Sequence, residues 1–573
     1  SSTTLTVSPP LDPFVSVEQL RQQADAAIAS FHAGDLEACL EQARRLQAQP
    51  VLAAEMHHLA GAALHQLGRS QESVPELKAA IAIDGHNASY YNTYGVVLRK
   101  LGQIELAIRS YERVAAISPS FSDVYYNWGN ALNELERTEE AVECFERCLA
   151  GNPEHWSAHH NLANALRDLK RLPEALEHYA SSAAINDNNP DMHCNWGLAW
   201  QLQERWDKAI ACFEKAIAQK SDHAPSHINL GSALAVQERF EEACRVLRRG
   251  VELDDSCNDA KFNLGLTLLT IGEFEEGWKF YDTRLRLPDK VRPPLSTPMW
   301  DGDLNIDGPL LVWCEQGFGD NIQFARYLPI LIEAGLQVSY STRASLIPLF
   351  QDCLGPHCPA LLEHKPAELR EFRHHIALLS LPRLLRTRLE TVPMMPGYLH
   401  PPSYIPDQLR IQRRPFALHI GLVWASGIDN KAMYADKSMP LEPLFHLFDS
   451  WREERLVVLH SLQVGADAEQ LAPYLGERGV VDHSKQLGDF RDTACVISQL
   501  DLVITVDTAV AHVAGGLNKP VWTMLQHNAD FRWLRGREDS PWYPSMSLVR
   551  QRSLGDWDSV IEQMRERLIR LLG

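Results

Sequence analysis

The stretch SDVYYNWGNALNELERTEEAVECFERCLAGNPEH, residues 122–155, is one copy of a pattern that recurs every 34 residues. It has a small residue at Gly129, a large apolar residue at Leu132 and a second small residue at Ala141. Along the chain the first small position is filled by Ala27, Gly61, Gly95, Gly129, Ala163, Gly197, Gly231 and Gly265. Two helices per copy explain the spacing, because small residues let paired helices approach and large ones fill the gap to the next pair. The sequence therefore predicts a helical repeat array.

Eight copies in register predict an α-solenoid over residues 20–291. The copies are 20–53, 54–87, 88–121, 122–155, 156–189, 190–223, 224–257 and 258–291. The first copy is the least regular, as expected of the cap of a solenoid. The pattern resembles the tetratricopeptide repeat, although the late-turn proline of that repeat occurs only at Pro119 and Pro153.

A row of asparagines lies two residues before the small position. It consists of Asn127, Asn161, Asn195, Asn229 and Asn263. This position of a helix pair faces the concave groove, where a carboxamide can donate to and accept from a peptide backbone. Hydrogen bonding within its own unit is the alternative. The spacing resembles the asparagine ladder of O-linked N-acetylglucosamine transferases, which implies that the groove holds an extended acceptor polypeptide.

The composition of the 573-residue chain is ordinary for a globular protein, with 45% hydrophobic and 23% charged residues. A formal net charge of −19 argues against a general nucleic-acid or anionic-membrane binder. No apolar run approaches the ~18–20 residues needed to span a bilayer. Residues 1–19 lack the pattern of a secretory signal and are expected to be a flexible tail. The 11 cysteines form no CxxC pair, which favours reduced thiols and a cytoplasmic location.

The repeat register stops in a proline-rich stretch, and residues 292–306 are expected to be an ordered linker. Beyond it, short apolar runs alternate with amphipathic segments, which indicates βαβ units. Strands are expected at 310–314, 336–341, 419–424, 455–462, 480–484, 501–506 and 520–525, and helices at 321–334 and 557–572. The pattern predicts an α/β half of two Rossmann-like lobes, 307–405 and 406–573, with the substrate cleft between them.

The string Gly-Phe-Gly-Asp at 317–320 lies between a predicted strand and a predicted helix. Its glycines permit a tight turn, and a helix N-terminus attracts a negative group. Taken alone, Asp320 is more simply a helix cap. The full string GFGDNIQFARYLPIL resembles the opening segment of heptosyltransferases and their repeat-fused relatives. That resemblance implies that Asp320 is the catalytic base and that Gly319 borders the donor.

A second motif, ITVDTAVAHVAGGLNKPVW at 504–522, ends a predicted strand at Asp507 and opens a helix. The Thr508 hydroxyl and the free N–H groups of the first turn can hold a diphosphate. A simple helix cap and a packed helix histidine at His512 are the alternative. The full string resembles the DTxxxH site of GT-B glycosyltransferases, the heptosyltransferase branch in particular. The resemblance assigns Asp507, Thr508 and His512 to the nucleotide-sugar donor.

Three further segments of the second lobe extend this resemblance. GLVWASGIDNKAMYADKSMPL, 421–441, places Ser426 after a strand and Lys437 on the following loop, where a lysine would neutralise phosphate charge. HSLQ at 460–463 would present Gln463 near the ribose or base. The segment 531–544 adds expected diphosphate contacts and expected packing residues. The former are Arg532 and Arg535, and the latter are Trp533, Trp542 and Tyr543.

No metal or cofactor is expected beside the nucleotide-sugar co-substrate. Asp301-Gly302-Asp303 follows the proline-rich stretch instead of ending a buried strand. The adjacent pairs His57-His58, His159-His160 and His374-His375 cannot both point at one ion from a regular helix. No Cys/His zinc spacing appears. Metal-independent GT-B chemistry fits this pattern.

The favoured function is a protein glycosyltransferase whose repeat groove holds the polypeptide acceptor. The resemblance of the repeats favours a UDP-linked donor, and bacterial relatives with this layout suggest flagellin or another surface protein as acceptor. Two alternatives stay open. One is a non-catalytic peptide-binding scaffold with a degenerate GT-B half. The other is a heptosyltransferase-like enzyme that acts on a glycan or a lipid-linked acceptor.

Overall fold

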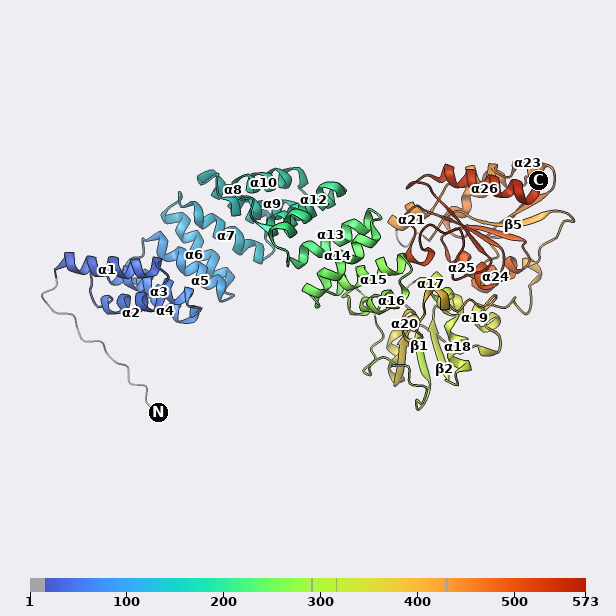
Figure 1. Ribbon diagram of the computed structural model, residues 1–573, viewed down its shortest axis with the longest axis horizontal. Helices are drawn as coiled ribbons and strands as arrows, with labels where there is room; N and C mark the ends of the chain where they lie inside the picture. The colour runs from blue at the N-terminus through green and yellow to red at the C-terminus, as the bar shows by residue number, and fades with distance from the viewer. Residues whose placement is uncertain (1–15, 290–291, 316, 428–430) are drawn as a thin grey trace. The chain divides into compact units, whose positions relative to one another are not determined.

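A computed structural model describes residues 16–289, 292–315, 317–427 and 431–573 of the chain. Most of the expected tail, 1–19, therefore lies outside the described residues. The chain divides into two compact units, residues 1–233 and 234–573. Figure 1 shows the helices and strands coloured along the chain. The division falls inside helix α13 (Ala224–Val236), within the seventh repeat.

The repeat array consists of paired helices, as the 34-residue period predicts. Their bounds are α1 (Val17–His32), α2 (Leu36–Leu46), α3 (Ala53–Gln66), α4 (Ser70–Ile83), α5 (Ala88–Lys100), α6 (Ile104–Ile117), α7 (Ser122–Glu134), α8 (Thr138–Gly151), α9 (Trp156–Asp168), α10 (Leu172–Ile185), α11 (Pro190–Leu202), α12 (Trp206–Gln219), α13 (Ala224–Val236), α14 (Phe240–Leu253), α15 (Asn258–Thr270) and α16 (Phe274–Tyr281). The small positions let the partner helix pack closely, and Gly95, Gly129 and Gly197 each receive an aromatic ring from it. A Cβ at Gly129 would lie 2.6 Å from the Phe145 ring. The small residue is therefore a packing requirement.

The first lobe has a parallel four-stranded sheet in the order β3-β2-β1-β4. The strands are β1 (Leu310–Trp313), β2 (Val338–Thr342), β3 (Ala360–Glu363) and β4 (His374–Ala377), and the helices are α17 (Phe318–Phe324), α18 (Tyr327–Glu333), α19 (Ile347–Cys353) and α20 (Leu381–Leu384). The helix predicted over 321–334 is two helices, because the α-helix is interrupted at Ala325 and Arg326. The strands β3 and β4 were not predicted. The pair His374-His375 lies on β4, so its side chains point to opposite faces of a strand.

The second lobe has a parallel six-stranded sheet in the order β10-β9-β8-β5-β6-β7. The strands are β5 (Leu418–Val423), β6 (Val457–Ser461), β7 (Val480–Asp482), β8 (Leu502–Val506), β9 (Val521–Leu525) and β10 (Met546–Arg550), and the helices are α21 (Lys431–Lys437), α22 (Leu441–His446), α23 (Asp449–Glu453), α24 (Phe490–Ser498), α25 (Ala509–Gly516) and α26 (Trp557–Leu572). Every strand expected in this lobe is present, and α26 has the predicted bounds. The structure adds β10 at the edge of the sheet.

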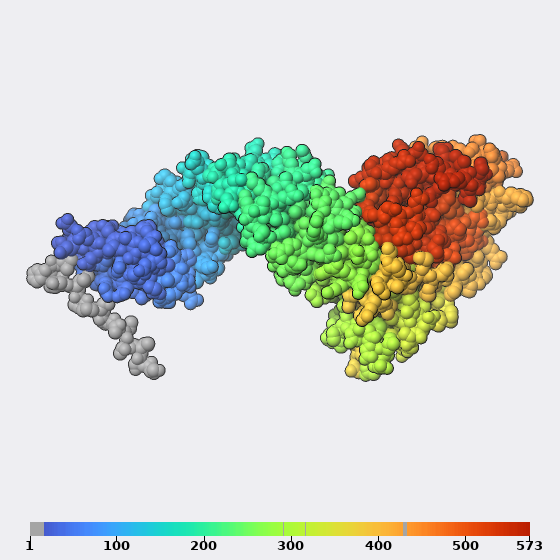
Figure 2. Space-filling view, in the orientation of Figure 1, coloured from blue at the N-terminus to red at the C-terminus, as the bar shows by residue number. Residues whose placement is uncertain are grey.

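The last repeat shares one hydrophobic core with the lobes. Trp278 of α16 packs edge-on against Phe324 of α17, with ring centroids 5.8 Å apart, and against Trp542, at 6.4 Å. The segment 292–306 contains no helix or strand, yet Trp300 within it is buried and its backbone N–H donates to His375. The linker is thus ordered. The structural division lies upstream of it, and the last repeat and the lobes form one continuous body (Figure 2).

Among the helices of the described ranges, none is both long and apolar enough to cross a bilayer.

Candidate functional site

The carboxyl ends of both sheets face the region where helices α17 and α25 pack together. In the second sheet the chain steps from β5 out to β7 and then returns to β8 on the other side of β5. In the first sheet it steps from β1 out to β3 and returns to β4 on the other side of β1. Ligands of open α/β sheets bind beyond the carboxyl ends of strands at such switch points. The fold therefore offers two binding edges.

A cavity of about 410 Å³ lies at the carboxyl edge of the second sheet. Ser426, Gln463 and Thr508 line it from the ends of β5, β6 and β8. Phe318 of α17 and Phe490 of α24 close it with rings 5.2 Å apart. The cavity combines an apolar wall with a few polar groups, as small-molecule sites commonly do.

A second cavity, of about 220 Å³, adjoins the first and shares Gly319, Lys437, Asp507 and Thr508 with it. Between them the two cavities gather the eight residues that the resemblance assigns to catalysis and to the donor. They are Gly319, Asp320, Ser426, Lys437, Gln463, Asp507, Thr508 and His512. Segments up to about two hundred positions apart in the sequence thus converge on one place.

Asp320 lies on the first turn of α17 and forms an ion pair with Arg532, with Oδ1 and Nη2 2.5 Å apart. Arg532 also contacts Asp530, at 2.6 Å. Burial raises the pKa of Asp320 to about 6, although the Arg532 charge opposes the shift, and the negative charges of Asp530 and Glu315 add to it. Burial also disfavours the Asp530 carboxylate, but the Arg532 charge and backbone amide lower the pKa of Asp530. The two carboxylates thus differ in proton affinity.

Lys437 ends α21, a short helix where a loop was predicted, and its Nζ lies 2.6 Å from Asp507 Oδ2. Both side chains are largely buried. The small cavity therefore contains two cations, Lys437 and Arg532, each already paired with carboxylate. A diphosphate would compete with these carboxylates for the same cations.

His512 is neutral at physiological pH, because burial lowers its pKa to about 3. Its Nδ1 is 2.8 Å from the Tyr543 hydroxyl, and its ring stacks on Trp533 with centroids 5.3 Å apart. Tyr543 can approach because Gly515 has no side chain, since a Cβ there would lie 2.5 Å from its ring. His512 can therefore offer a ligand a hydrogen bond but no positive charge.

Gly319 packs directly on that imidazole. A Cβ at Gly319 would lie 2.9 Å from His512 Cδ2 and 3.1 Å from Nε2. The ring is already held by Tyr543 and Trp533, so it cannot easily move. The second glycine of the motif thus permits the close packing of α17 on α25.

We expect Gly319→Ala to lower the free energy of unfolding by ~1–3 kcal/mol, the usual range for an overpacked site. Chemical denaturation measures the change. Gly85→Ala is the matched control, because a Cβ at Gly85 would make only an ordinary contact at 3.5 Å. Equal stability of the two variants would show that α17 and His512 can shift apart.

Gly317 starts the same turn with φ = +79°, a conformation that favours glycine. The Asn321 side chain holds the turn, because its amide donates to the Gly317 carbonyl at 2.6 Å. In return, Asn321 Oδ1 accepts a bond of 2.6 Å from the Tyr340 hydroxyl. This network positions Asp320 on its helix, and no role for Asn321 was predicted from the sequence.

Thr508 caps α25 with extended backbone, and its hydroxyl lies 3.1 Å from that of Thr505. Its side chain makes no capping bond to the helix. The first N–H groups of α25 therefore keep their capacity for an anion at the cavity. Among the described residues, the buried Ser426 hydroxyl also has no hydrogen-bond partner. Both features suit the binding of a polar ligand.

Gln463 is buried, and its amide bonds to the backbone around β5. Its oxygen accepts from the N–H groups of Trp424 and Ala425 at 3.0 and 2.9 Å, and its nitrogen donates to Ala425 at 3.1 Å. Gln463 thus lines the large cavity, where it was expected to meet the ribose or base, but its polar atoms hold the loop that carries Ser426.

The two arginines expected to contact the diphosphate lie in different places in the structure. Arg532 lines the small cavity. Arg535 instead donates to the His527 carbonyl and faces Glu238 of the seventh repeat at 3.4 Å. Trp533, Trp542 and Tyr543 are fully buried packing residues, as predicted, although the Tyr543 hydroxyl also contacts His512.

The asparagine row makes contacts between successive repeats. Asn127 donates to Asn92, Asn161 to Asn130, and Asn229 to the Cys194 sulfur. The Asn195 amide contacts His160 at 3.2 Å, and its oxygen accepts from Arg167 at 3.3 Å. The row, which includes Asn263, is half-buried. These bonds all run to the preceding repeat, so they differ from the alternative of hydrogen bonding within one unit.

No cluster of three or more His, Cys, Asp or Glu side chains able to hold a metal ion is found in the part of the chain that the structure describes.

Comparison with known proteins identifies the repeats. A tetratricopeptide-repeat family model matches residues 126–190 and 198–256, and related models match 54–87 and 95–135. The chain therefore contains a tetratricopeptide-repeat solenoid, joined to an α/β half with parallel sheets.

Among curated proteins, the chain is similar to Protein FlbA of Caulobacter vibrioides, with 26% identity over 318 residues. The match covers 51% of this chain and 52% of FlbA, so the chain spans about half the length of this relative. Among solved structures, YrrB, a TPR protein with an unusual peptide-binding site, is 23% identical, with a TM-score of 0.29 over 32% of this chain and 95% of YrrB. PilF of Pseudomonas aeruginosa is 20% identical, with a TM-score of 0.34 over 37% of this chain and 96% of PilF.

Proposed function

We propose that the protein is a glycosyltransferase that moves a sugar from a nucleotide donor to a hydroxyl of a polypeptide held by the repeats. The observation that carries the proposal is the convergence of eight predicted catalytic and donor residues, with Arg532 beside them, on two adjoining cavities, although Arg535 lies elsewhere. A carboxyl of raised pKa, Asp320, lies among them. The proposal is of the metal-independent GT-B type that the strand-end motifs resemble, and it places the reaction in the cytoplasm.

The two cavities suit the two parts of a nucleotide sugar. The larger one has an apolar wall with Phe318 and Phe490 for a nucleoside. The smaller one offers Lys437, Thr508 and the first turn of α25 to a diphosphate. The sugar would then lie toward Asp320, which borders only the smaller of the two.

In the proposed step, the acceptor oxygen attacks the anomeric carbon of the donor, and its proton passes to the Asp320 carboxylate. The bond between the anomeric carbon and the diphosphate oxygen breaks, and the nucleoside diphosphate leaves with the electron pair. Lys437 and the first-turn N–H groups of α25 stabilise the charge on this leaving group. His512 contributes a hydrogen bond as a neutral imidazole.

A panel of nucleotide sugars tests the donor half of the proposal. UDP-, GDP-, CMP- and ADP-linked sugars are added to the full chain, and thermal denaturation is measured. A true donor at ~100-fold its Kd should stabilise the protein by ~2.7 kcal/mol. Intact mass of a co-expressed polypeptide, flagellin or another surface protein first, then detects transfer.

A peptide-binding scaffold is the second candidate function, and the tetratricopeptide matches favour it. No response to any nucleotide sugar, together with peptide binding by the repeats, would support the scaffold.

The transfer rate should depend on the protonation of Asp320. Its pKa of about 6 lies above the ordinary value, because burial favours the neutral acid. A protonated carboxyl cannot accept a proton, so kcat/KM should fall about tenfold per pH unit below 6 and level off above it. Initial rates between pH 5 and 8 measure this limb.

Arg532→Gln should shift the same limb to higher pH, because the Arg532 charge favours the Asp320 carboxylate. A flat wild-type profile would contradict the assignment of Asp320 as the base.

A further inference from the structure

A third cavity, of about 330 Å³, lies at the carboxyl edge of the first sheet. All four strands contribute to it just beyond their ends, through Glu315 after β1, Arg343 after β2, His364 after β3 and Leu379 after β4. This edge includes the switch point between β1 and β4, where α/β sheets bind ligands. The donor residues predicted from the sequence lie elsewhere. Asp320 alone among them borders this cavity and the 220 Å³ cavity.

The last repeat forms the opposite wall of this cavity. Phe262 of α15 and Tyr281 of α16 line it, together with Arg284 and Leu285 of the 3₁₀ helix η1 (Asp282–Arg286). The rings of Phe262 and Tyr281 lie 5.6 Å apart. A repeat of the solenoid therefore takes part directly in the site, beside the two lobes.

Tyr281 departs from the packing of its repeat position. The equivalent residues, spaced by 34, are Leu77, Tyr111, Phe145, Tyr179, Phe213 and Leu247. Tyr111, Phe145 and Phe213 place their rings on the glycine of the preceding helix, where a Cβ would approach within 2.4 to 2.6 Å. A Cβ at Gly265 would instead lie against the backbone of Phe280 and Tyr281, 2.5 Å from the Tyr281 nitrogen. The Tyr281 ring is thus released from its usual place.

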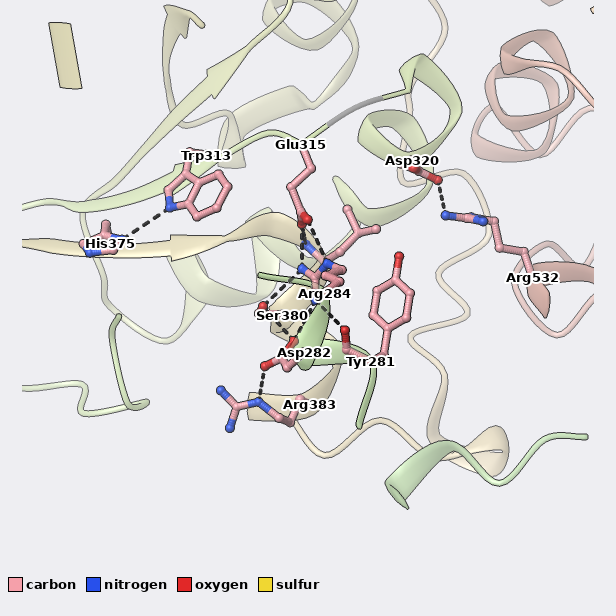
Figure 3. A network of polar contacts seen from close by, with 11 residues as sticks. Tyr281, Asp282, Arg284, Trp313, Glu315, Asp320, His375, Ser380, Arg383 and Arg532 are labelled. Carbon is pink, nitrogen blue, oxygen red and sulfur yellow. Dashed lines mark hydrogen bonds and ion pairs between the residues drawn. The ribbon is translucent and has the colours of Figure 1, made fainter. Parts of the chain in front are cut away.

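Figure 3 shows the Tyr281 hydroxyl pointing toward the ion pair of Asp320 and Arg532. Phenylalanine fills the equivalent position in two other repeats, so packing does not require this hydroxyl. A polar group that packing does not require, aimed at the carboxyl of the proposed base, is suited to contact a substrate.

The charges around the cavity are mostly paired. Glu315 accepts two bonds from Arg284, at 2.7 and 2.6 Å, and Arg284 also donates to Asp282 at 2.9 Å (Figure 3). His364 contacts the Ser341 hydroxyl at 2.7 Å, and burial lowers its pKa, so it is uncharged at neutral pH. The guanidinium of Arg343 lies 4.8 Å from the centre of the Phe318 ring. The remaining walls are apolar or aromatic, which suits a neutral occupant.

We propose that this cavity receives the acceptor residue of the polypeptide, with its hydroxyl directed at Asp320 and hydrogen-bonded by Tyr281. An apolar neighbouring side chain packs against Phe262, Leu285 and Leu379. The inference rests on the proposed glycosyltransferase function and names its acceptor class, a serine or threonine with small apolar neighbours. At about 330 Å³ the cavity is near the lower limit of ~300–1,000 Å³ for ligand pockets, which fits a short peptide segment.

Tyr281→Phe and Phe262→Ala test the proposal in the full-length chain. The probes are fluorescein-labelled peptides Gly-Ala-Thr-Ala-Gly and Gly-Asp-Thr-Asp-Gly, and anisotropy measures their binding without any chemistry. We expect the wild type to bind the alanine-flanked peptide at least tenfold more tightly. Tyr281→Phe should raise its Kd several-fold, and Phe262→Ala should reduce the preference for alanine over aspartate.

Tyr111→Phe is the matched control, since it removes a hydroxyl from the same repeat position of another repeat. The Tyr111 hydroxyl is buried and has no partner among the described residues. Its removal should leave both Kd values unchanged. Thermal denaturation of each variant identifies any loss of folding, and the Tyr281→Phe protein should melt as the wild type does.

Peptide binding separates this inference from the function on which it rests. Equal Kd values for wild type and Tyr281→Phe, or equal binding of the two peptides, would overturn the acceptor pocket even if sugar transfer occurs. The protein could instead bind the alanine-flanked peptide preferentially through Tyr281 but bind no nucleotide sugar. That result would support the acceptor pocket and refute the glycosyltransferase function.

Discussion

Asp320→Asn should abolish sugar transfer almost completely while the protein still binds its nucleotide sugar. Asparagine keeps the shape of the side chain but cannot accept the acceptor proton, and a positioned general base contributes ~10²- to 10⁴-fold to a rate. Asp320 borders the proposed donor and acceptor cavities, so it is placed to receive that proton. Intact mass of the acceptor over time measures the loss, and calorimetry measures donor affinity.

Asp530→Asn is the matched control for this experiment. Asp530 contacts the same guanidinium but has a lowered pKa, and it does not border the acceptor-side cavity. Its loss should reduce transfer far less than the loss of Asp320. Turnover by Asp320→Asn at the wild-type rate would exclude the proposed base.

The triple variant Asn195→Ala, Asn229→Ala, Asn263→Ala should raise the acceptor KM by one or more orders of magnitude. Each carboxamide is worth ~0.5–1.5 kcal/mol if it makes one hydrogen bond to the acceptor backbone. The donor Kd should not change, because none of the three borders the donor cavities. Kinetics with a full-length acceptor polypeptide measure the effect.

The structure makes a stability control necessary for this variant. The Asn195 carboxamide already bonds to His160 and Arg167, and Asn229 contacts Cys194, so alanine also removes contacts inside the array. Asn133→Ala, on helix α7 but outside the row, measures how much stability and acceptor affinity change when one asparagine outside the row is removed. A normal KM in a triple variant that is folded would refute backbone recognition by the row.

The repeats could be predicted closely because their period is local and repeated. A 34-residue spacing of small residues reports directly on helix pairs, and the glycine contacts of Gly129 and its equivalents show why. The strands β5 to β9 of the second lobe are mostly apolar runs, typical of buried parallel strands, and were also predictable, whereas β10 was not predicted. In contrast, β3 is a short edge strand with exposed ends, and β4 begins with two histidines. Within each four-residue strand the apolar run is only two or three residues long, too short to predict a buried strand.

The site was predictable where a strand ends in a motif and not where distant side chains meet. Asp320 and Asp507 follow or end strands and carry recognisable strings. Gln463 bonds to the backbone of Trp424 and Ala425 because the neighbouring strands β5 and β6 bring these residues together. The turn of Tyr281 away from its repeat depends on how closely α16 approaches Gly265. Such facts arise from tertiary packing, and no local pattern encodes them.

The shared core of α16 and the lobes decides where this chain can be recombined. Because Trp278 packs against Phe324 and Trp542, exchange of the final helical pair without the α/β half would break their common core. Upstream of residue 234, the array is a separate compact unit. We therefore expect gain, loss or exchange of repeats there to leave intact the wall that Tyr281 builds beside Asp320.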